Sequence, residues 1–409
     1  MIKWKEAELG EYCDFQEGYV NPSKEHPEYF GGSVKWCRAV DINDGYIYHT
    51  SQTLTEEGFK SAKKSALLFE PNTIVISKSG TIGRVGIIKD YMCGNRATIN
   101  IKPKNNADVE FIFYMLKSKQ REFADLAVGS VQKNLYVSIL EKIKFKFPSL
   151  DNQKKISSYI STIDKKIEIN NQINRNLSEQ AQAVFKEWFV DNPESAKWKQ
   201  GTFSDLVIST LGGDWGKEEK EGNYTEQVYC VRGADIPEVK EGNKGKMPTR
   251  FILPKNYAAK QLVAGDIVVE ISGGSPTQST GRVASISQSL LDRYDKGMVC
   301  TNFCRAIKPK DGYSMFIYYY WQYLYERGIF FLYENGTTGI KNLDIKGFLE
   351  NEEIIIPPKD LVDKFDALCQ TIFNEIFKNG ISTEKLAETR DTLLPRLMSG
   401  KLDVSELEL

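Results

Sequence analysis

The 409-residue chain has only two histidines and an odd set of seven cysteines, and these shortages limit the metal chemistry it could perform. The cysteines are scattered and form no CxxC pair. A zinc site usually needs four Cys, His or carboxylate ligands at regular spacing. Cys300 and Cys304 have a suitable spacing between them, but no second pair follows. We therefore expect no metal site and no disulfide framework, and interpret the cysteines as buried thiols of a reduced cytoplasmic protein.

Long apolar runs are also missing. No stretch approaches the roughly 18 consecutive apolar residues that span a bilayer. The first residues, Met1–Glu6, carry charges where a signal peptide needs an apolar run of about 7 to 15 residues. The 41% of hydrophobic and 27% of charged residues are those of an ordinary folded protein. A soluble, cytoplasmic protein of two or three domains is expected, with no membrane partner.

A strong net charge is lacking as well. The formal charge of −1 gives no overall electrostatic case for nucleic acid. Any DNA site must then be a local patch, and one candidate is Val131–Lys155, where six lysines face only two acidic residues, Glu141 and Asp151. Within this segment, lysines and apolar residues alternate along Lys142–Phe147. In a strand this alternation places the lysines on one face. The competing interpretation is an ordinary solvated strand face.

What the sequence does contain is a duplication with a period near 200 residues, which is too long for a solenoid and suits two copies of a domain plus a helix. Each half carries several short apolar runs, one aromatic helical segment, a glycine-containing loop and a last apolar strand. This order predicts a mixed α+β domain in each half. The best matches are Thr73–Gly80 with Asp266–Gly273, Gly83-Arg84-Val85 with Gly281-Arg282-Val283, and Lys133-Asn134-Leu135 with Lys341-Asn342-Leu343.

A long helical segment follows the last strand of each copy. Apolar residues recur there in alternating steps of three and four, which is a heptad seam. We expect the two helices to form an antiparallel coiled coil, because an isolated apolar strip needs a partner. The seam residues are Ile156, Ile160, Ile163, Ile167, Leu177, Val184 and Trp188 in the first helix and Leu361, Phe365, Leu368, Ile372, Leu393 and Leu397 in the second.

Polar residues interrupt this seam at two matching places. Asn170 and Asn174 occupy seam positions, where a polar side chain can fix the register at some cost in stability. The second copy has Asn379-Gly380 at the corresponding place. Glycine costs about 1 kcal/mol in a helix interior, so a break in the second helix is expected there.

These patterns together predict an α+β fold of two duplicated mixed α/β domains, separated and joined by two long helices that form an antiparallel coiled coil. The expected ranges are 1–150 for the first domain, 151–192 for the central helix, 193–358 for the second domain and 359–409 for the C-terminal helix.

No pattern of catalytic residues accompanies the duplication. No Walker A loop is present, since every Gly-Lys pair lacks the following Ser or Thr. Two histidines without a matched nucleophile give no support for a triad. Asp266 and Glu270 could resemble a metal-binding pair, but the first copy has Thr73 and Ser77 in their places. We therefore predict a non-catalytic chain with no cofactor of its own.

The loops instead repeat Ser, Gly, Lys, Arg and Asn, the residue types that contact phosphates and base edges. Arginine can bridge guanine O6 and N7, and asparagine can bridge adenine N6 and N7. For any one of these residues the alternative is an ordinary turn or surface position. The predicted DNA-binding residues are Lys78, Arg84, Arg96, Lys133, Asn134, Arg282, Lys341 and Asn342.

The arrangement of two like domains, each followed by a long helix, resembles the DNA-specificity subunits of Type I restriction-modification systems. The segments most similar to that family are Phe185–Val190 and Leu393–Gly400, at the ends of the two helices, and the repeated Ile-Ser-Lys-Ser-Gly...Gly-Arg-Val segment. The resemblance covers essentially the whole chain.

The resemblance implies partners as well as a function. Each domain would bind one half of an interrupted double-stranded DNA target, and the two unlike domains would make that target asymmetric. The helices would dock two methyltransferase subunits, through which restriction subunits join. S-adenosylmethionine, ATP and Mg would then belong to these partners. Two alternatives stay open: a coiled-coil adaptor that does not bind DNA, and the recognition part of a nuclease system.

Overall fold

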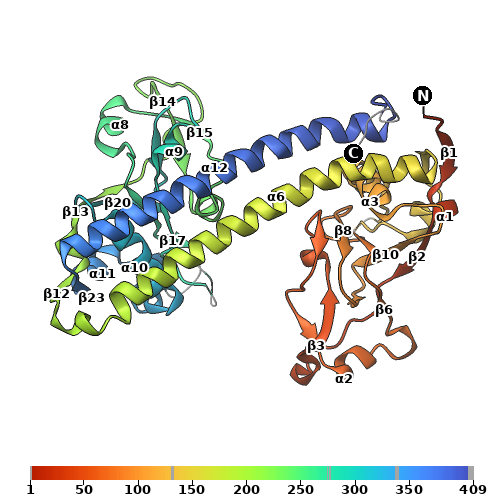
Figure 1. Ribbon diagram of the computed structural model, residues 1–409, viewed down its shortest axis with the longest axis horizontal. Coiled ribbons are helices and arrows are strands. Elements are labelled where there is room, and N and C mark those ends of the chain that lie inside the picture. The colour runs from red at the N-terminus through yellow and green to blue at the C-terminus, as the bar shows by residue number, and fades with distance from the viewer. Residues whose placement is uncertain (1, 130–132, 274, 276–277, 337–339, 404–409) are drawn as a thin grey trace. The chain divides into compact units, whose positions relative to one another are not determined.

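The computed structural model of the protein describes residues 2–129, 133–273, 275, 278–336 and 340–403 (Figure 1). The chain divides into two compact units, Met1–Lys165 with Ala387–Leu409 (unit 1) and Lys166–Leu386 (unit 2). The ranges expected from the sequence treat each long helix as a separate segment. The contacts instead assign one part of each long helix to each unit.

Unit 1 is built around a five-stranded sheet in which two neighbouring strands, β7 (Ile74–Ser77) and β8 (Val85–Ile88), are buried along their whole length. The burial of β7, the central strand, is expected of a strand that is covered on both faces. Helix α3 (Val109–Ser118) buries six consecutive residues in the same core. The strand order is β2 (Cys13–Glu17), β10 (Thr98–Pro103), β7, β8 (Val85–Ile88) and β4 (Tyr46–Ile47).

A second sheet of unit 1 contains the parallel pair of β3 (Phe30–Cys37) and β9 (Met92–Gly94). Strands β5 (Thr53–Leu54) and β6 (Leu68–Phe69) flank that pair. The short helices of the unit are α1 (Leu9–Tyr12), α2 (Glu56–Lys60), α4 (Gln120–Leu126) and α5 (Val137–Leu140).

The lysine-rich segment near residue 144 forms strand β11 (Lys144–Phe147), with the predicted alternation of exposed lysines and buried phenylalanines. It pairs in antiparallel fashion with β1 (Lys5–Glu8). In this register Glu6 lies opposite Lys146 and Glu8 opposite Lys144. Cross-strand pairs of opposite charge stabilise a sheet, so these lysines already have acidic neighbours within the protein.

Unit 2 repeats the two main sheets of unit 1 with the same strand order. β13 (Val207–Gly212), β20 (Cys304–Pro309), β16 (Ile267–Glu270) and β18 (Val283–Ser285) correspond to β2, β10, β7 and β8. The parallel pair of β14 (Glu226–Val231) and β19 (Met298–Cys300) corresponds to β3 and β9. The shared topology confirms the duplication that the sequence predicted.

The remaining elements of unit 2 surround these sheets. β12 (Lys199–Thr202) pairs with β23 (Glu353–Ile356), as β1 pairs with β11. The other strands are β15 (Thr249–Ile252), β17 (Ser272–Gly273), β21 (Glu334–Asn335) and β22 (Lys341–Leu343). The helices are α7 (Ile236–Lys240), α8 (Pro254–Lys260), α9 (Gln288–Leu291), α10 (Ser314–Glu326) and α11 (Ile345–Asn351).

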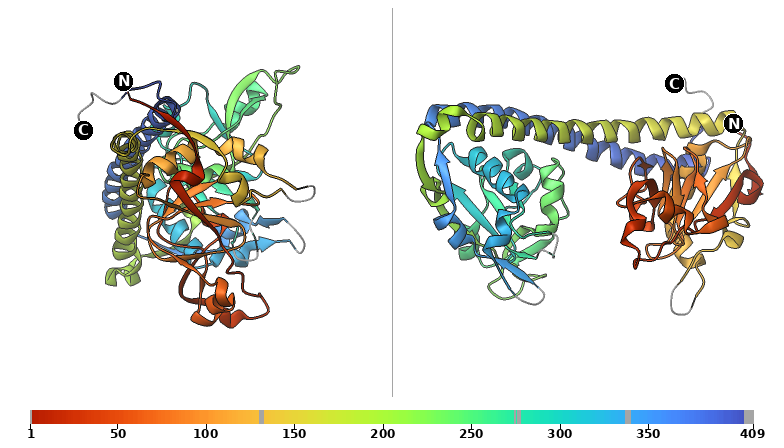
Figure 2. Two further views of the ribbon diagram at one scale, coloured as in Figure 1. Left: turned by 90° about the vertical axis from the view of Figure 1, so that its right-hand side faces the viewer. Right: turned by 90° about the horizontal axis from the view of Figure 1, so that it is seen from below.

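Two long helices follow the last strands, as predicted. Helix α6 (Leu150–Phe185) ends in a π-helical turn, Lys186–Val190, and α12 (Lys359–Met398) is continuous over 40 residues. In unit 1, Arg390 donates to Asp164 at 2.9 Å. In unit 2, Asn170 bonds Thr383 at 3.3 Å, whereas Trp188 packs against Phe365. Later residues of α6 thus meet earlier residues of α12, so the pair is antiparallel in unit 2 (Figure 2).

The seam residues contact the domain cores as well as the opposite helix. Ile156 and Ile160 are fully buried in the unit 1 core together with Leu397, and Phe365 is fully buried in the unit 2 core. The other predicted seam residues are half-buried. These are Ile163, Ile167, Leu177, Val184, Trp188, Leu361, Leu368, Ile372 and Leu393.

The predicted helix break at Asn379-Gly380 is wrong. Helix α12 runs through both residues, and Gly380 serves a close contact instead. A Cβ atom there would lie 1.9 Å from the carbonyl oxygen of Gly242, in the loop after α7. The same loop is held by Asn174, which donates to the carbonyls of Glu241 and Ile376 at 2.9 Å each. The glycine at position 380 therefore allows the close approach of the Gly242 loop and does not end the helix.

All seven cysteines are free and buried, which confirms their interpretation as interior thiols. Within residues 2–129, 133–273, 275, 278–336 and 340–403, no three or more His, Cys, Asp or Glu side chains gather as metal ligands would. In those same ranges, no helix combines the length and the apolar character that crossing a membrane requires.

Candidate nucleic-acid interface

Four loop segments of unit 1 meet beyond the end of strand β7, and backbone hydrogen bonds hold them together. The amide of Lys78 donates to the carbonyl of Ala97, and the carbonyl of Lys78 accepts from the amide of Leu135. The amide of Asn95 donates to the carbonyl of Cys37. We call this group loop cluster 1, and its residues are 38–41, 78–84, 95–97 and 133–135.

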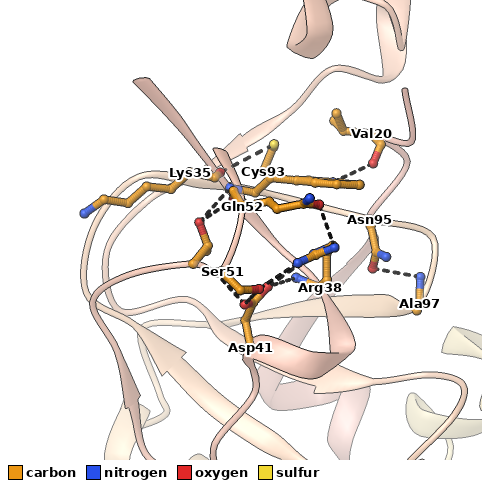
Figure 3. A network of polar contacts seen from close by, with 11 residues as sticks. Val20, Lys35, Arg38, Asp41, Ser51, Gln52, Cys93, Asn95 and Ala97 are labelled. Atoms are coloured by element: carbon orange, nitrogen blue, oxygen red, sulfur yellow. Dashed lines mark hydrogen bonds and ion pairs between the residues drawn. The ribbon is translucent and has the colours of Figure 1, made fainter. Parts of the chain in front are cut away.

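The turn at Arg38 is a compact polar network (Figure 3). The Asp41 carboxylate accepts the Arg38 backbone amide at 2.9 Å and caps a short 3-10 turn. The Arg38 guanidinium donates to Gln52 and Ser51 at 2.8 and 2.7 Å. Since the Ser51 hydroxyl and amide also bond Asp41, the guanidinium is held in one orientation at the surface.

Loop cluster 2, in unit 2, has the same backbone pattern. The amide of Ile271 donates to the carbonyl of Phe303, and the carbonyl of Ile271 accepts from the amide of Leu343. The amide of Thr301 donates to the carbonyl of Val231, next to a second Arg-x-x-Asp turn at Arg232. The residues of loop cluster 2 are 232–235, 271–273, 301–303 and 341–343.

These bonds correct one sequence correspondence. Asn95 and Asn302 occupy similar places in the sequence, each before a strand that ends in Ile-Lys-Pro. In the structure, however, Thr98 pairs with Ser77 as Cys304 pairs with Glu270. Counting back from Thr98 and Cys304 makes Arg96, not Asn95, equivalent to Asn302. The two equivalent positions thus carry two of the side chains best suited to reading base edges.

Most of the predicted DNA-binding residues lie in the loop clusters, but several of their cations are already paired. Lys78 donates to Glu17 at 2.7 Å, and Lys341 donates to Glu334 at 2.7 Å. Arg84 lies 3.6 Å from Asp44. Arg282, adjoining loop cluster 2 after β17, donates twice to Glu270, at 2.7 and 2.6 Å. Their role as DNA contacts stays a prediction.

These pairs alter the titration of their members. The hydrogen bonds that Arg282 donates to Glu270 raise the pKa of the guanidinium above its usual value, although burial acts in the opposite direction. Burial opposes ionisation of Glu334, but hydrogen bonds from Lys341 and Thr280 hold the pKa of this carboxyl below its usual value. Both shifts favour the charged forms of Arg282 and Glu334. Asp266 also has a cationic partner, Lys308, so both carboxylates that resemble a metal pair in the sequence are engaged in ion pairs.

Two of the remaining predicted residues differ from these paired cations. Arg96 and Lys133 are exposed and make no hydrogen bond or ion pair within the described part of the chain. Asn134 bridges Val128 through its backbone. The Asn342 side chain accepts a hydrogen bond from Ser272. The structure therefore gathers predicted residues into each cluster and leaves Arg96 as an unpaired arginine in loop cluster 1.

Loop cluster 2 also borders a cavity of about 510 Å³. Its apolar walls are Trp215 and Phe303, and Arg232 and Asn302 contribute polar groups. Phe303 is 60% exposed, which is unusual for so large an apolar side chain. Trp215 is fixed by the guanidinium of Arg250, 3.7 Å from its ring centre.

The residues predicted from the sequence do not include Arg38, Arg232, Asn302 or Phe303. Arg38 and Arg232 occur in a repeated Arg-x-x-Asp-Ile pattern, which could have marked them. Asn302 resembles Asn95 in the sequence, and only the strand register reveals its equivalence to Arg96. No local signal distinguishes an arginine paired with a distant carboxylate from one that is free.

Two like domains with polar loop clusters of different composition, each continuing into a long helix, define a protein that carries two similar but distinct recognition surfaces. Comparison with known proteins identifies the family to which this protein belongs. The model of the Type I restriction modification DNA specificity domain matches residues 1–179 and 197–388. The chain belongs to this family of Type I restriction-modification specificity subunits.

Relatives and a solved structure agree with that assignment. The specificity subunit of the Type I restriction enzyme MjaIX from Methanocaldococcus jannaschii is 28% identical, over 95% of this chain and 91% of its own length. The HindI specificity subunit of Haemophilus influenzae is 24% identical over 74% of this chain and 79% of its own. A crystal structure of the S subunit from M. genitalium shares the fold, with a TM-score of 0.56 at 17% identity over 97% of this chain and 96% of that one.

Proposed function

We propose that the chain is the non-catalytic, DNA-reading subunit of a Type I restriction-modification complex, and that its two units each read one half of an asymmetric, interrupted double-stranded target. The observation that carries this proposal is the pairing of one topology with two different surfaces. Arg96 in unit 1 and Asn302 in unit 2 occupy equivalent exposed positions. Different side chains on one scaffold favour different bases, so the two half-sites should differ.

The same proposal assigns the long helices to partner binding. Two methyltransferase subunits would dock on α6 and α12, and restriction subunits would join through the methyltransferase. S-adenosylmethionine, ATP and Mg would be held by those partners. This is supported by the sequence, which contains no Walker A loop and no Asn-Pro-Pro-Tyr or Asp-Pro-Pro-Tyr tetrapeptide of the kind that holds the target base in amino-methyltransferases. A cytoplasmic location follows from the role of such a complex on DNA.

Methylome sequencing tests the proposal in a host that lacks DNA methylation of its own. The chain is expressed with its methyltransferase, and each partner is also expressed alone. We expect one interrupted, asymmetric methylated motif, present only when both proteins are made. A continuous or palindromic motif, or methylation by the methyltransferase alone, would contradict the proposal.

Electrophoretic mobility shifts separate the alternatives. An adaptor without DNA binding would co-purify with the methyltransferase but leave its DNA affinity unchanged. A nuclease would cut DNA when Mg²⁺ is added to the purified chain. We expect neither result, and instead a sequence-dependent shift that strengthens when the methyltransferase is added.

A further inference from the structure

The turn that leads into β10 in unit 1 and into β20 in unit 2 presents an exposed polar side chain at the same structural position. Arg96 and Asn302 are both exposed, and neither makes a hydrogen bond or ion pair within the described part of the chain. Both turns are anchored by identical backbone bonds to the preceding parallel strand. A side chain that is free to reach outward from a rigid turn is well placed to read DNA.

The neighbouring candidates are less available for that role. Using Lys78, Arg282 or Lys341 to contact a base would require breaking an ion pair with Glu17, Glu270 or Glu334. Their carboxylate partners are only 20%, 9% and 5% exposed. Leaving a buried carboxylate unpaired is costly. These pairs are therefore better suited to stiffening the loops than to reading bases.

The residue after Asn302 adds a second chemical feature. Phe303 is 60% exposed, and it lines the cavity of about 510 Å³ together with Asn302. An A·T pair displays adenine N6 and N7 and the thymine methyl group along the same major-groove edge. An amide beside an exposed aromatic ring matches that combination. In unit 1 the equivalent pair is Arg96 and Ala97, which matches the O6 and N7 acceptors of guanine and offers no large apolar surface.

We propose that these two turns determine the base specificity of each half-site, an inference that rests on the proposed function. Arg96 reads a guanine. Asn302 and Phe303 together read an A·T pair, through the adenine edge and the thymine methyl group. The remaining loop residues would position the DNA backbone and contact other bases. The proposal names the base class at one position of each half-site.

The first test is methylome sequencing of the complete complex with the variants Arg96→Ala and Asn302→Ala. We expect each variant to relax one motif position, a guanine in one half-site and an adenine in the other, with a roughly ten- to hundredfold loss of preference measured on matched duplexes. Arg121→Ala and Asn223→Ala are the controls, because these residues have the same types and are exposed elsewhere. Both control variants should leave the motif unchanged.

The second test uses the chemistry of the thymine methyl group. Deoxyuridine in place of the thymine opposite the relaxed adenine removes only that methyl group. Binding of the wild-type complex should weaken severalfold on this duplex, whereas Phe303→Ala should bind the two duplexes equally. Arg96→Lys is a further variant that keeps the charge but loses the rigid planar guanidinium, so it should retain overall affinity and weaken the guanine preference less than Arg96→Ala does.

The outcomes distinguish the inference from the proposed function. If the wild-type complex yields no interrupted motif, the proposed function fails. If the motif is present but Arg96→Ala and Asn302→Ala leave it intact, or each relaxes positions in both half-sites, the inference alone is overturned. A wild-type complex that is indifferent to deoxyuridine at that position would overturn the role of Phe303.

Discussion

At the scale of single residues, burial governs the chemistry of the cysteines. Burial raises the pKa of Cys13, Cys37, Cys93, Cys230 and Cys300 to about 12. An unfolded thiol titrates near 8.5. We therefore expect the native chain to react with Ellman's reagent at pH 8 far more slowly than the chain unfolded in guanidinium chloride. The unfolded chain should react at close to seven thiols per molecule. Rapid reaction of the native chain would show that these thiols are accessible.

The same shifts fix the sign of a pH dependence. Because the folded pKa of each thiol is raised, the unfolded chain releases its protons first as the pH rises. The unfolded state then binds fewer protons, so stability falls with increasing pH. The loss should begin near pH 8.5 and continue towards 12, and it should diminish when a buried cysteine such as Cys300 is replaced by alanine.

A second residue-scale prediction concerns the two arginines of the repeated Gly-Arg-Val segment. Arg282 donates two hydrogen bonds to Glu270, whose side chain is only 9% exposed. Arg84 lies 3.6 Å from Asp44, and both side chains of that pair are 31% exposed. Removing one partner of a buried pair strands the other charge. We expect Arg282→Ala to destabilise unit 2 by about 3 kcal/mol and Arg84→Ala to cost less than about 1 kcal/mol.

Urea denaturation of both variants, monitored by hydrogen exchange of β16 and β7, measures this difference. Arg282→Ala with unchanged stability but a relaxed DNA motif would instead make Arg282 a base reader, as the sequence pattern suggests. The comparison is informative because the two arginines occupy equivalent positions of the repeat, so their backbone surroundings are alike.

At the scale of secondary-structure elements, Gly380 provides a test in which two physical effects oppose each other. Helix propensity alone predicts that Gly380→Ala stabilises α12 by about 1 kcal/mol. The close approach of Gly242, 1.9 Å from the added Cβ, predicts a net loss, of about 1 to 3 kcal/mol. Thermal unfolding should show the loss. Asn374→Ala, at an exposed site of the same helix, is the matched control and should be neutral or slightly stabilising.

Most helices and strands could be predicted from the sequence, and the predictions that differ from the structure share one physical cause. Heptad spacing predicts both long helices, and alternation predicts β11, because those signals are local. The expected break at Gly380 is wrong because its reason, the contact with Gly242, involves residues 138 positions apart in the chain. The pairing of Lys78 with Glu17 is equally non-local. The sequence therefore indicates which residue types recur in the loops, but not which of them are free to bind DNA.

At the scale of the whole molecule, exchange of one recognition domain tests whether the two units read DNA independently. The proposed function predicts that replacing the first domain by that of another family member changes one half-site and leaves the other untouched. The structure adds a condition for this experiment. Residues 1–150 do not form a complete core, because Ile156 and Ile160 of α6 and Leu394 and Leu397 of α12 are buried in the same cluster.

An exchange that ends at residue 150 would therefore pack the donor's domain against α6 and α12 residues that fit the core of the original domain. We expect such a chimera to unfold at a lower temperature than a second chimera that also carries the donor's residues at positions 156, 160, 394 and 397. Both chimeras retain unit 2, including Asn302, so each active chimera should keep the original second half-site in methylome sequencing. A repaired chimera that is stable but alters both half-sites would show that the units do not read DNA separately.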